Sequence, residues 1–138
     1  MSKETITQLA IFIENRTGRL AEICKNLGDQ GINIFGFSIA DTKDYGIFRL
    51  ICKRPQFVHE VLKSVGFTVR ESEVICVRVP HRPGGLAEVL QAFSDAEINV
   101  EYLYAIANTL IIFNLDKPEL GIEILHKKGI EIIKQEEL

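Results

Sequence analysis

The sequence has little of what several classes of protein require. It has no tryptophan, and its three cysteines, Cys24, Cys52 and Cys76, are an odd number without C-x-x-C spacing. We therefore expect buried thiols in a reducing cytoplasm rather than disulfides. The longest apolar run, residues 9–13, is far shorter than the roughly 18 residues that a membrane span needs. The polar N-terminus also lacks the features of a secretory signal.

Excess positive charge is absent as well. Sixteen basic residues stand against 19 acidic ones, the formal net charge is −3, and no more than two basic residues are consecutive. This balance does not fit a protein that tracks nucleic-acid phosphates. The G-x-S-x-G, G-x-x-x-x-G-K-[ST], H-E-x-x-H and G-x-G-x-x-G motifs do not occur. His59, His81 and His126 are spread over different expected elements. We therefore predict no metal site, no cofactor and no catalytic residues.

What the chain does contain is an internal repeat. Residues 16–23 match residues 82–89 at an offset of 66, and the register continues to the Ile-Asn-Ile of 32–34 and the Ile-Asn-Val of 98–100. Past this point the offset becomes 63, which aligns Pro55 with Pro118. The three lost residues fall opposite 41–45, a polar stretch typical of a hairpin tip. The sequence therefore predicts two copies, 1–72 and 73–138, joined by the short link 71–73.

Each copy shows the same order of expected elements. A strand is followed by a glycine turn, an amphipathic helix, two strands, a second helix opened by proline, and a short final strand. In the first helix, Cys24 belongs to the apolar stripe and is expected in the core. The expected strands are 5–14, 32–40, 46–53 and 67–70 in the first copy, and 74–80, 98–107, 109–115 and 130–133 in the second.

This order, β-α-β-β-α-β, predicts an α+β fold of two ferredoxin-like units. Each unit would have a four-stranded antiparallel sheet with both helices on one face. Units of this size have small cores, so we expect the two copies to pack side by side. The strands at 9–13 and 110–113 are apolar on both faces. Either a few apolar residues are simply exposed, or a homodimer covers the helix-free face.

The first turn of each copy carries the clearest functional signal. A glycine precedes each first helix, Gly18 in one copy and Gly84 in the other. Glycine permits a positive φ and the close approach of a ligand, and the following amides favour a carboxylate or phosphate. Tight packing alone also explains such a glycine. Arg16 and Arg82 repeat beside the turns, where they either bind an anion or cover the sheet edge.

These motifs resemble those of the ACT domain family of small regulatory modules. The family carries a strand, a D/N-x-x-G-x-L turn, a helix and a G-x-N-I start of the second strand. The first copy has Asn15 to Leu20 and Gly31 to Ile34 at these places. It is especially similar to the serine-sensing regulatory domain of phosphoglycerate dehydrogenase, which has proline at the Thr17 position.

The resemblance implies that a free amino acid binds at the interface between two ACT units. One unit would supply the glycine turn and the other the asparagine that begins its second strand. Asparagine suits a zwitterion because its amide both donates and accepts hydrogen bonds. His81 stands where the first copy has Asn15, which would retune the second site and its pH response. One implied site contains Asn15, Arg16, Thr17, Gly18, Arg19, Leu20, Asn99 and Val100. The other contains His81, Arg82, Gly84, Gly85, Leu86, Asn33 and Ile34.

The structural alternative for Asn33 and Asn99 is that both are only turn residues. Tyr102 and Tyr104 share one strand face, where they line either a ligand pocket or the seam between the copies. We expect a cytoplasmic, non-enzymatic amino-acid sensor that acts on a partner enzyme or transporter of amino-acid metabolism. The alternative function is a regulatory subunit that docks on such an enzyme without a ligand of its own. An enzyme is the third and weakest reading, since fold does not determine function.

Overall fold

A computed structural model of the chain describes residues 3–14, 16–41, 45–107 and 109–138. The chain forms two compact units. The N-terminal unit is Thr7–Ser72, and the C-terminal unit is Glu73–Leu138 together with the first residues of the chain up to Ile6.

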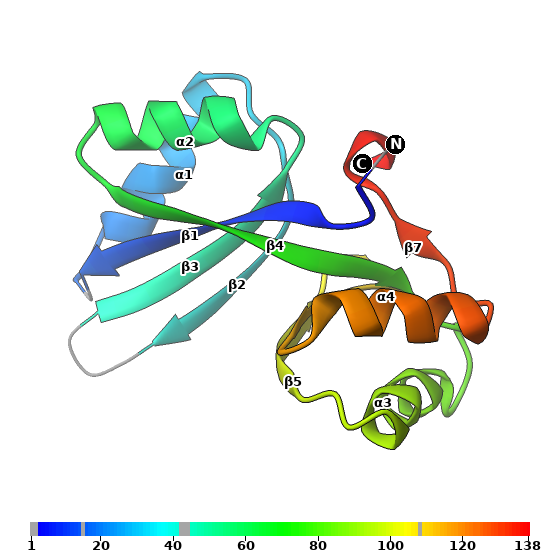
Figure 1. Cartoon of the computed structure of the whole chain (residues 1–138). Coiled ribbons are helices and arrows are strands. Elements are labelled where there is room, and N and C mark those ends of the chain that lie inside the picture. The colour runs from blue at the N-terminus through cyan, green and yellow to red at the C-terminus, as the bar shows by residue number, and fades with distance from the viewer. Residues whose placement is uncertain (1–2, 15, 42–44, 108) are drawn as a thin grey trace. The chain divides into compact units, whose positions relative to one another are not determined.

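The N-terminal unit has four strands and two helices (Figure 1). Its strands lie in the order β2-β3-β1-β4, so the first and last strands of the repeat are neighbours. Antiparallel pairing places Leu9 opposite Leu50 and Ile11 opposite Phe48. Figure 1 shows both helices on one side of these strands. The elements are β1 (Ile6–Glu14), α1 (Arg19–Asp29), β2 (Ile34–Asp41), β3 (Tyr45–Cys52), α2 (Pro55–Ser64) and the start of β4 (Thr68–Arg78).

The C-terminal unit repeats this order. Strand β4 lies between β7 and β6, and β5 is the outer strand beyond β6. Phe113 pairs with Ile75 of β4 on one side and with Leu103 of β5 on the other. The elements after β4 are α3 (Gly85–Asp95), β5 (Val100–Ala105), β6 (Leu110–Leu115), α4 (Pro118–Lys127), β7 (Ile132–Ile133) and the 3₁₀ turn η1 (Gln135–Glu137). The prediction of two ferredoxin-like units is therefore confirmed.

Strand β4 differs from the sequence prediction. The expected strands 67–70 and 74–80, and the link between them, form one continuous strand, Thr68–Arg78. The polar residues Glu71, Ser72 and Glu73 were read as a linker because of their composition. Strand pairing of the neighbouring segments, which composition does not reveal, carries the extended backbone through them.

Each unit has its own core between the strands and the helices. In the N-terminal unit, α1 contributes Ile23 and Leu27, and α2 contributes Val58 and Leu62. The prediction that Cys24 belongs to this core is wrong, because its side chain is exposed. Ile23 and Leu27 are four residues apart, so they lie on the same face of α1, and this is the buried face. Cys24 follows Ile23 directly and therefore lies off the centre of that face. The C-terminal core is built from equivalent positions, including Val89, Phe93 and Leu125.

Candidate functional site

The two glycine turns have the same backbone geometry. Gly84 has φ 83° and ψ −5°, and Gly18 has φ 89° and ψ −13°. In the C-terminal unit, the Gly85 N–H donates to the Arg82 carbonyl at 2.9 Å, which closes a four-residue turn. This is a type II turn, which needs a positive φ at its third residue and accepts proline at its second. Pro83 and Gly84 fill these two places, so the sequence specifies the turn locally.

The turns leave backbone donors at the starts of α1 and α3. Within the described part of the chain, the N–H groups of Leu86 and Ala87 have no hydrogen-bond partner, and those of Leu20 and Ala21 also have none. The N-cap residues, Gly18 and Gly84, have no side chain that could cap these amides. The helix dipole adds partial positive charge at this point, so the helix starts favour a carboxylate.

A hollow of about 450 Å³ lies beside the turn of the C-terminal unit. The predicted site residues His81, Arg82 and Leu86 line it, together with Pro83 of the turn. Ile111 of β6 also lines the hollow and was not predicted, since nothing in its own sequence context marks it. The structure therefore brings the predicted turn residues together around a space next to free amide donors.

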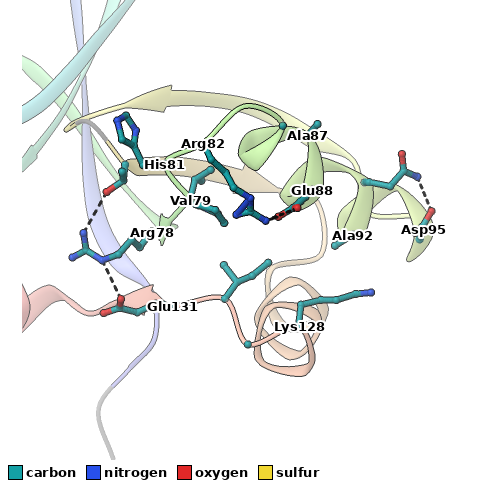
Figure 2. Close-up of a pocket in the computed structure, with 16 residues that line it drawn as sticks. Arg78, Val79, His81, Arg82, Ala87, Glu88, Ala92, Asp95, Lys128 and Glu131 are labelled. Carbon is teal, nitrogen blue, oxygen red and sulfur yellow. Dashed lines mark hydrogen bonds and ion pairs between the residues drawn. The ribbon is translucent and has the colours of Figure 1, made fainter.

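A larger cleft of about 1020 Å³ lies in the same unit and is shown in Figure 2. It shares His81, Arg82 and Gly84 with the turn, and α3 and the segment 128–131 supply other walls. The Arg82 Nη2 contacts both carboxylate oxygens of Glu88, at 2.5 and 2.7 Å. The sequence allows Arg82 either to bind an anion or to cover the sheet edge. In this structure its charge is paired with Glu88.

The equivalent cleft of the N-terminal unit is occupied by the chain's own Arg19. The Arg19 guanidinium carbon lies 4.3 Å from the centroid of the Phe67 ring, and its Nη1 lies 2.9 Å from Glu22. The space that remains is only about 250 Å³. The repeat position in the C-terminal unit is Gly85, where an added Cβ would lie 1.9 Å from the Pro80 carbonyl oxygen. Backbone packing therefore excludes a side chain there, and the C-terminal cleft stays open.

Of the predicted asparagines, the structure describes Asn33 and Asn99, and neither is among the residues that line the hollows at the glycine turns. Asn33 lines a separate hollow of about 310 Å³ at the start of β2. The Asn99 N–H donates to Asp116 Oδ1 at 2.9 Å. Ile34 and Val100 begin the strands β2 and β5. Asn15, the remaining predicted polar ligand, lies outside the described residues. Thr17 is exposed, and Arg16 is paired with Glu14 at 3.2 Å.

Histidines and cysteines form no metal centre in the described ranges, where no group of three or more His, Cys, Asp or Glu side chains could hold an ion. His59 Nδ1 lies 2.5 Å from Glu71 and His126 Nε2 lies 2.7 Å from Glu4. These contacts join each histidine to a carboxylate of another segment of the chain. Burial raises the pKa of Cys52 to about 11 and that of Cys76 to about 12, so both remain neutral thiols near pH 7.

No helix among the described residues is long and apolar enough to cross a bilayer.

Comparison with known proteins identifies the family. Residues 4–138 match the ACT domain pair, so the chain belongs to the ACT domain family. A protein of Bacteroides thetaiotaomicron is 31% identical, with a TM-score of 0.93 and coverage of 97% of this chain and 95% of that one. The resemblance inferred from the two glycine turns is therefore confirmed.

More distant structures share the fold. The ligand-free regulatory subunit of aspartate kinase from Thermus thermophilus is 16% identical, with a TM-score of 0.65 and coverage of 88% of this chain and 91% of that one. The structure of aspartokinase alpha and beta subunits is 15% identical, with a TM-score of 0.57 and coverage of 94% and 99%. No curated protein sequence matches the chain. The two distant structures therefore share the fold of the chain.

Proposed function

We propose that this chain is a regulatory protein that binds a free amino acid at the glycine turns before α1 and α3. The observation that carries the proposal is the pair of unpartnered amides, Leu86 and Ala87, next to the hollow lined by His81 and Arg82. A ligand carboxylate would accept hydrogen bonds from these amides at the positive end of the helix dipole. The N-cap residue, Gly84, has no side chain that could compete with the ligand for them.

The ligand's ammonium group needs oxygen acceptors. The family resemblance assigns this role to an asparagine of the other copy, Asn99 for the Gly18 turn and Asn33 for the Gly84 turn. An asparagine side chain offers both an acceptor and donors, as a zwitterion requires. These two assignments are predictions that variants test separately.

The partner in this proposal is an enzyme or transporter of amino-acid metabolism, and the chain itself is not catalytic. Structural similarity to the aspartate kinase regulatory subunit supports a role in allosteric control. Ligand binding would shift the population of a form that the partner recognises, to the extent that the ligand binds this form more tightly.

A thermal-shift screen of the full chain against the twenty amino acids tests the proposal. A ligand at about 100 times its Kd adds about 2.7 kcal/mol of stability, which corresponds to roughly 5–10 °C for a chain of this size. The matched N-acetyl amide of any hit, which lacks both charges, should give no shift. A flat response to all twenty amino acids would contradict the proposal and favour the ligand-independent docking subunit.

Calorimetry with the identified amino acid then separates the two asparagines. Asn99→Ala should weaken one class of site and Asn33→Ala the other, each by about 10-fold or more, since hydrogen bonds to charged groups contribute about 1.5–3 kcal/mol. Asn26→Ala, an exchange of the same kind on α1, is the control. Equal affinities in all three variants would remove both asparagines from the proposed sites.

A further inference from the structure

The starts of β2 and β5 are equivalent in the repeat but carry different charges. At the start of β5, the Asn99 N–H donates to Asp116 Oδ1 at 2.9 Å, and the Asp116 N–H donates back to the Asn99 carbonyl at 3.1 Å. Lys117 Nζ donates to the Glu97 carbonyl at 2.9 Å. At the start of β5, the hydrogen-bonding groups of the Asn99 N–H and the Glu97 carbonyl are thus paired with the chain's own Asp116 carboxylate and Lys117 ammonium group.

In the N-terminal unit the same positions hold two cations. Lys53 stands at the position of Asp116, and Arg54 at that of Lys117. In the part of the chain that the structure describes, neither side chain has a carboxylate partner and the Asn33 N–H has no hydrogen-bond acceptor. Arg54 is instead directed over Phe57, with its guanidinium carbon 4.7 Å from the ring centroid.

A hollow lies where the carboxylate is missing. Its volume is about 310 Å³, and the residues that line it are Gly31, Ile32, Asn33, Phe35, Lys53 and Arg54. The pairing of β2 with β3 shifts between Ile34 and Gly36, which leaves Phe35 out of the ladder next to the hollow. Bulges of this kind are frequent beside binding sites because they redirect a side chain. The volume is at the lower end of the range of small-molecule sites.

We propose that this hollow binds a small dicarboxylate, whose carboxylates contact Asn33, Lys53 and Arg54. Asp116 shows which group the strand start accepts, since its carboxylate bonds the equivalent backbone N–H of Asn99. Two cations favour a ligand with two negative charges. The planar Arg54 guanidinium can donate two hydrogen bonds to one carboxylate. The Lys53 ammonium group and the Asn33 N–H can donate to the other. This hollow shares Asn33 with the amino-acid site proposed for the Gly84 turn. The dicarboxylate would use the Asn33 backbone N–H, whereas the amino acid would use the Asn33 side chain, so dicarboxylate binding does not require an amino acid at the turns.

Calorimetric titration of the full chain with succinate at low ionic strength tests the site. Succinate carries two carboxylates but no ammonium group, so its binding does not report on the amino-acid site. We expect one succinate per chain, with affinity that falls as salt is added. Lys53→Gln should weaken binding by about 10-fold or more, since a charge-assisted contact is lost. Lys53→Asp, which recreates the arrangement at Asp116, should abolish it.

Lys63→Gln, on the exposed side of α2, is the matched control and should leave succinate affinity unchanged. In amide NMR spectra, the Asn33 resonance should shift with succinate, and the Gly84 and Leu86 resonances should not. Unchanged succinate affinity in Lys53→Asp, or equal binding of neutral succinamide, would overturn the proposal. Tighter binding of inorganic phosphate than of succinate would overturn the assignment to a carboxylate. A flat amino-acid screen with succinate bound at Asn33 would refute the proposed function alone.

Discussion

At the residue scale, the glycines of this chain differ in what they contribute. Gly18 and Gly84 have a positive φ and open space around them, so they are needed for backbone conformation. Gly85 is needed for a different reason, because the Pro80 carbonyl occupies the place of a Cβ. Gly28 meets neither condition, since nothing lies within 4 Å of its added Cβ and it is part of α1.

These differences predict opposite effects of the same substitution. Gly85→Ala should destabilise the chain by about 3 kcal/mol or more, since the backbone must move to relieve the overlap. Gly28→Ala should stabilise it by about 0.5–1 kcal/mol through helix propensity. Urea unfolding measures both. A Gly85→Ala protein as stable as the wild type would show that the turn does not pack as described.

The cysteines predict a loss of stability at alkaline pH. Burial raises the pKa of Cys52 to about 11 and that of Cys76 to about 12, above the value near 8.5 expected in the unfolded chain. Both thiols are neutral in both states below pH 8.5, so nothing is lost there. Above it the unfolded chain loses protons first, and the free energy of unfolding falls until the folded thiols ionise. Each thiol contributes about 2 kcal/mol, so we expect a loss of about 4 kcal/mol between pH 8 and pH 10.

Cys52→Ala should reduce this pH dependence. Burial raises the pKa of Cys24 too, but this thiol is exposed, so Cys24→Ser should reduce the pH dependence less. In the native protein one thiol, Cys24, should react rapidly with Ellman's reagent. Rapid reaction of all three thiols would contradict the burial of the other two.

Sequence reasoning at this scale is most accurate where local chemistry decides the conformation. The type II turn at Pro83 and Gly84 follows from its own residues, and the structure has it. The exposure of Cys24 was missed because an apolar stripe defines a helix face only to within one position. The repeat shows that Arg19 and Gly85 differ at one aligned position, but it does not show what the difference does. Arg19 fills the cleft because it stacks on Phe67, and only the folded structure brings these two residues together.

At the scale of elements, Arg19 closes the cleft at the start of α1. The side chain stacks on Phe67 and pairs with Glu22, and its buried Nε has no hydrogen-bond partner among the described residues. The unsatisfied Nε offsets part of what the stack and the ion pair contribute. We therefore expect Arg19→Ala to cost only about 1 kcal/mol in the free energy of unfolding.

Arg19→Lys separates the two interactions, because lysine keeps the charge but lacks the planar group that stacks. Arg70→Ala, which removes a more distant guanidinium at 5.7 Å from the Phe12 ring, is a control of similar size. A loss well above 3 kcal/mol for Arg19→Ala would show that the cleft collapses without this side chain.

Element order was predictable and element length was not. Prolines at the starts of α2 and α4, and glycines after helices, mark boundaries in both copies. The continuity of β4 was hidden because Glu71, Ser72 and Glu73 are polar. Strand length is determined by which neighbours pair with the backbone, and that is a property of the whole sheet.

At the scale of the whole molecule, the remaining prediction concerns assembly. The strands at 9–13 and 110–113 are apolar on both faces, and this pattern predicts a homodimer that covers the helix-free face. Phe37 and Ile39 of the outer strand β2 are 59% and 48% exposed, which adds apolar surface available to a second copy. Sedimentation at micromolar concentration should therefore give a mass above the 15.6 kDa of one chain.

A substitution identifies the surface involved. Ile39→Lys should dissociate the dimer if β2 carries the contact, since a charge on an edge strand opposes pairing. Glu60→Lys, on the exposed side of α2, is the control. A mass of 15.6 kDa at all concentrations, with and without amino acids, would contradict the dimer.

The ACT domain pair could be recognised from sequence because its two short motifs occur twice in the same register. The site is only partly deducible in this way. The motifs identify the turns, but the hollows depend on residues such as Ile111 and Lys53 that belong to no motif. Their position follows from strand pairing between segments far apart in the chain.

The central claim is that an amino acid binds at the glycine turns, and its most direct test is an amide NMR titration of the full chain. The amino acid with the largest thermal shift is added to ¹⁵N-labelled protein. The account predicts saturable shifts at the backbone amides of Leu86 and Ala87, and at Leu20 and Ala21 if both turns are occupied. Saturable shifts confined to amides elsewhere, with these four unchanged, would contradict it.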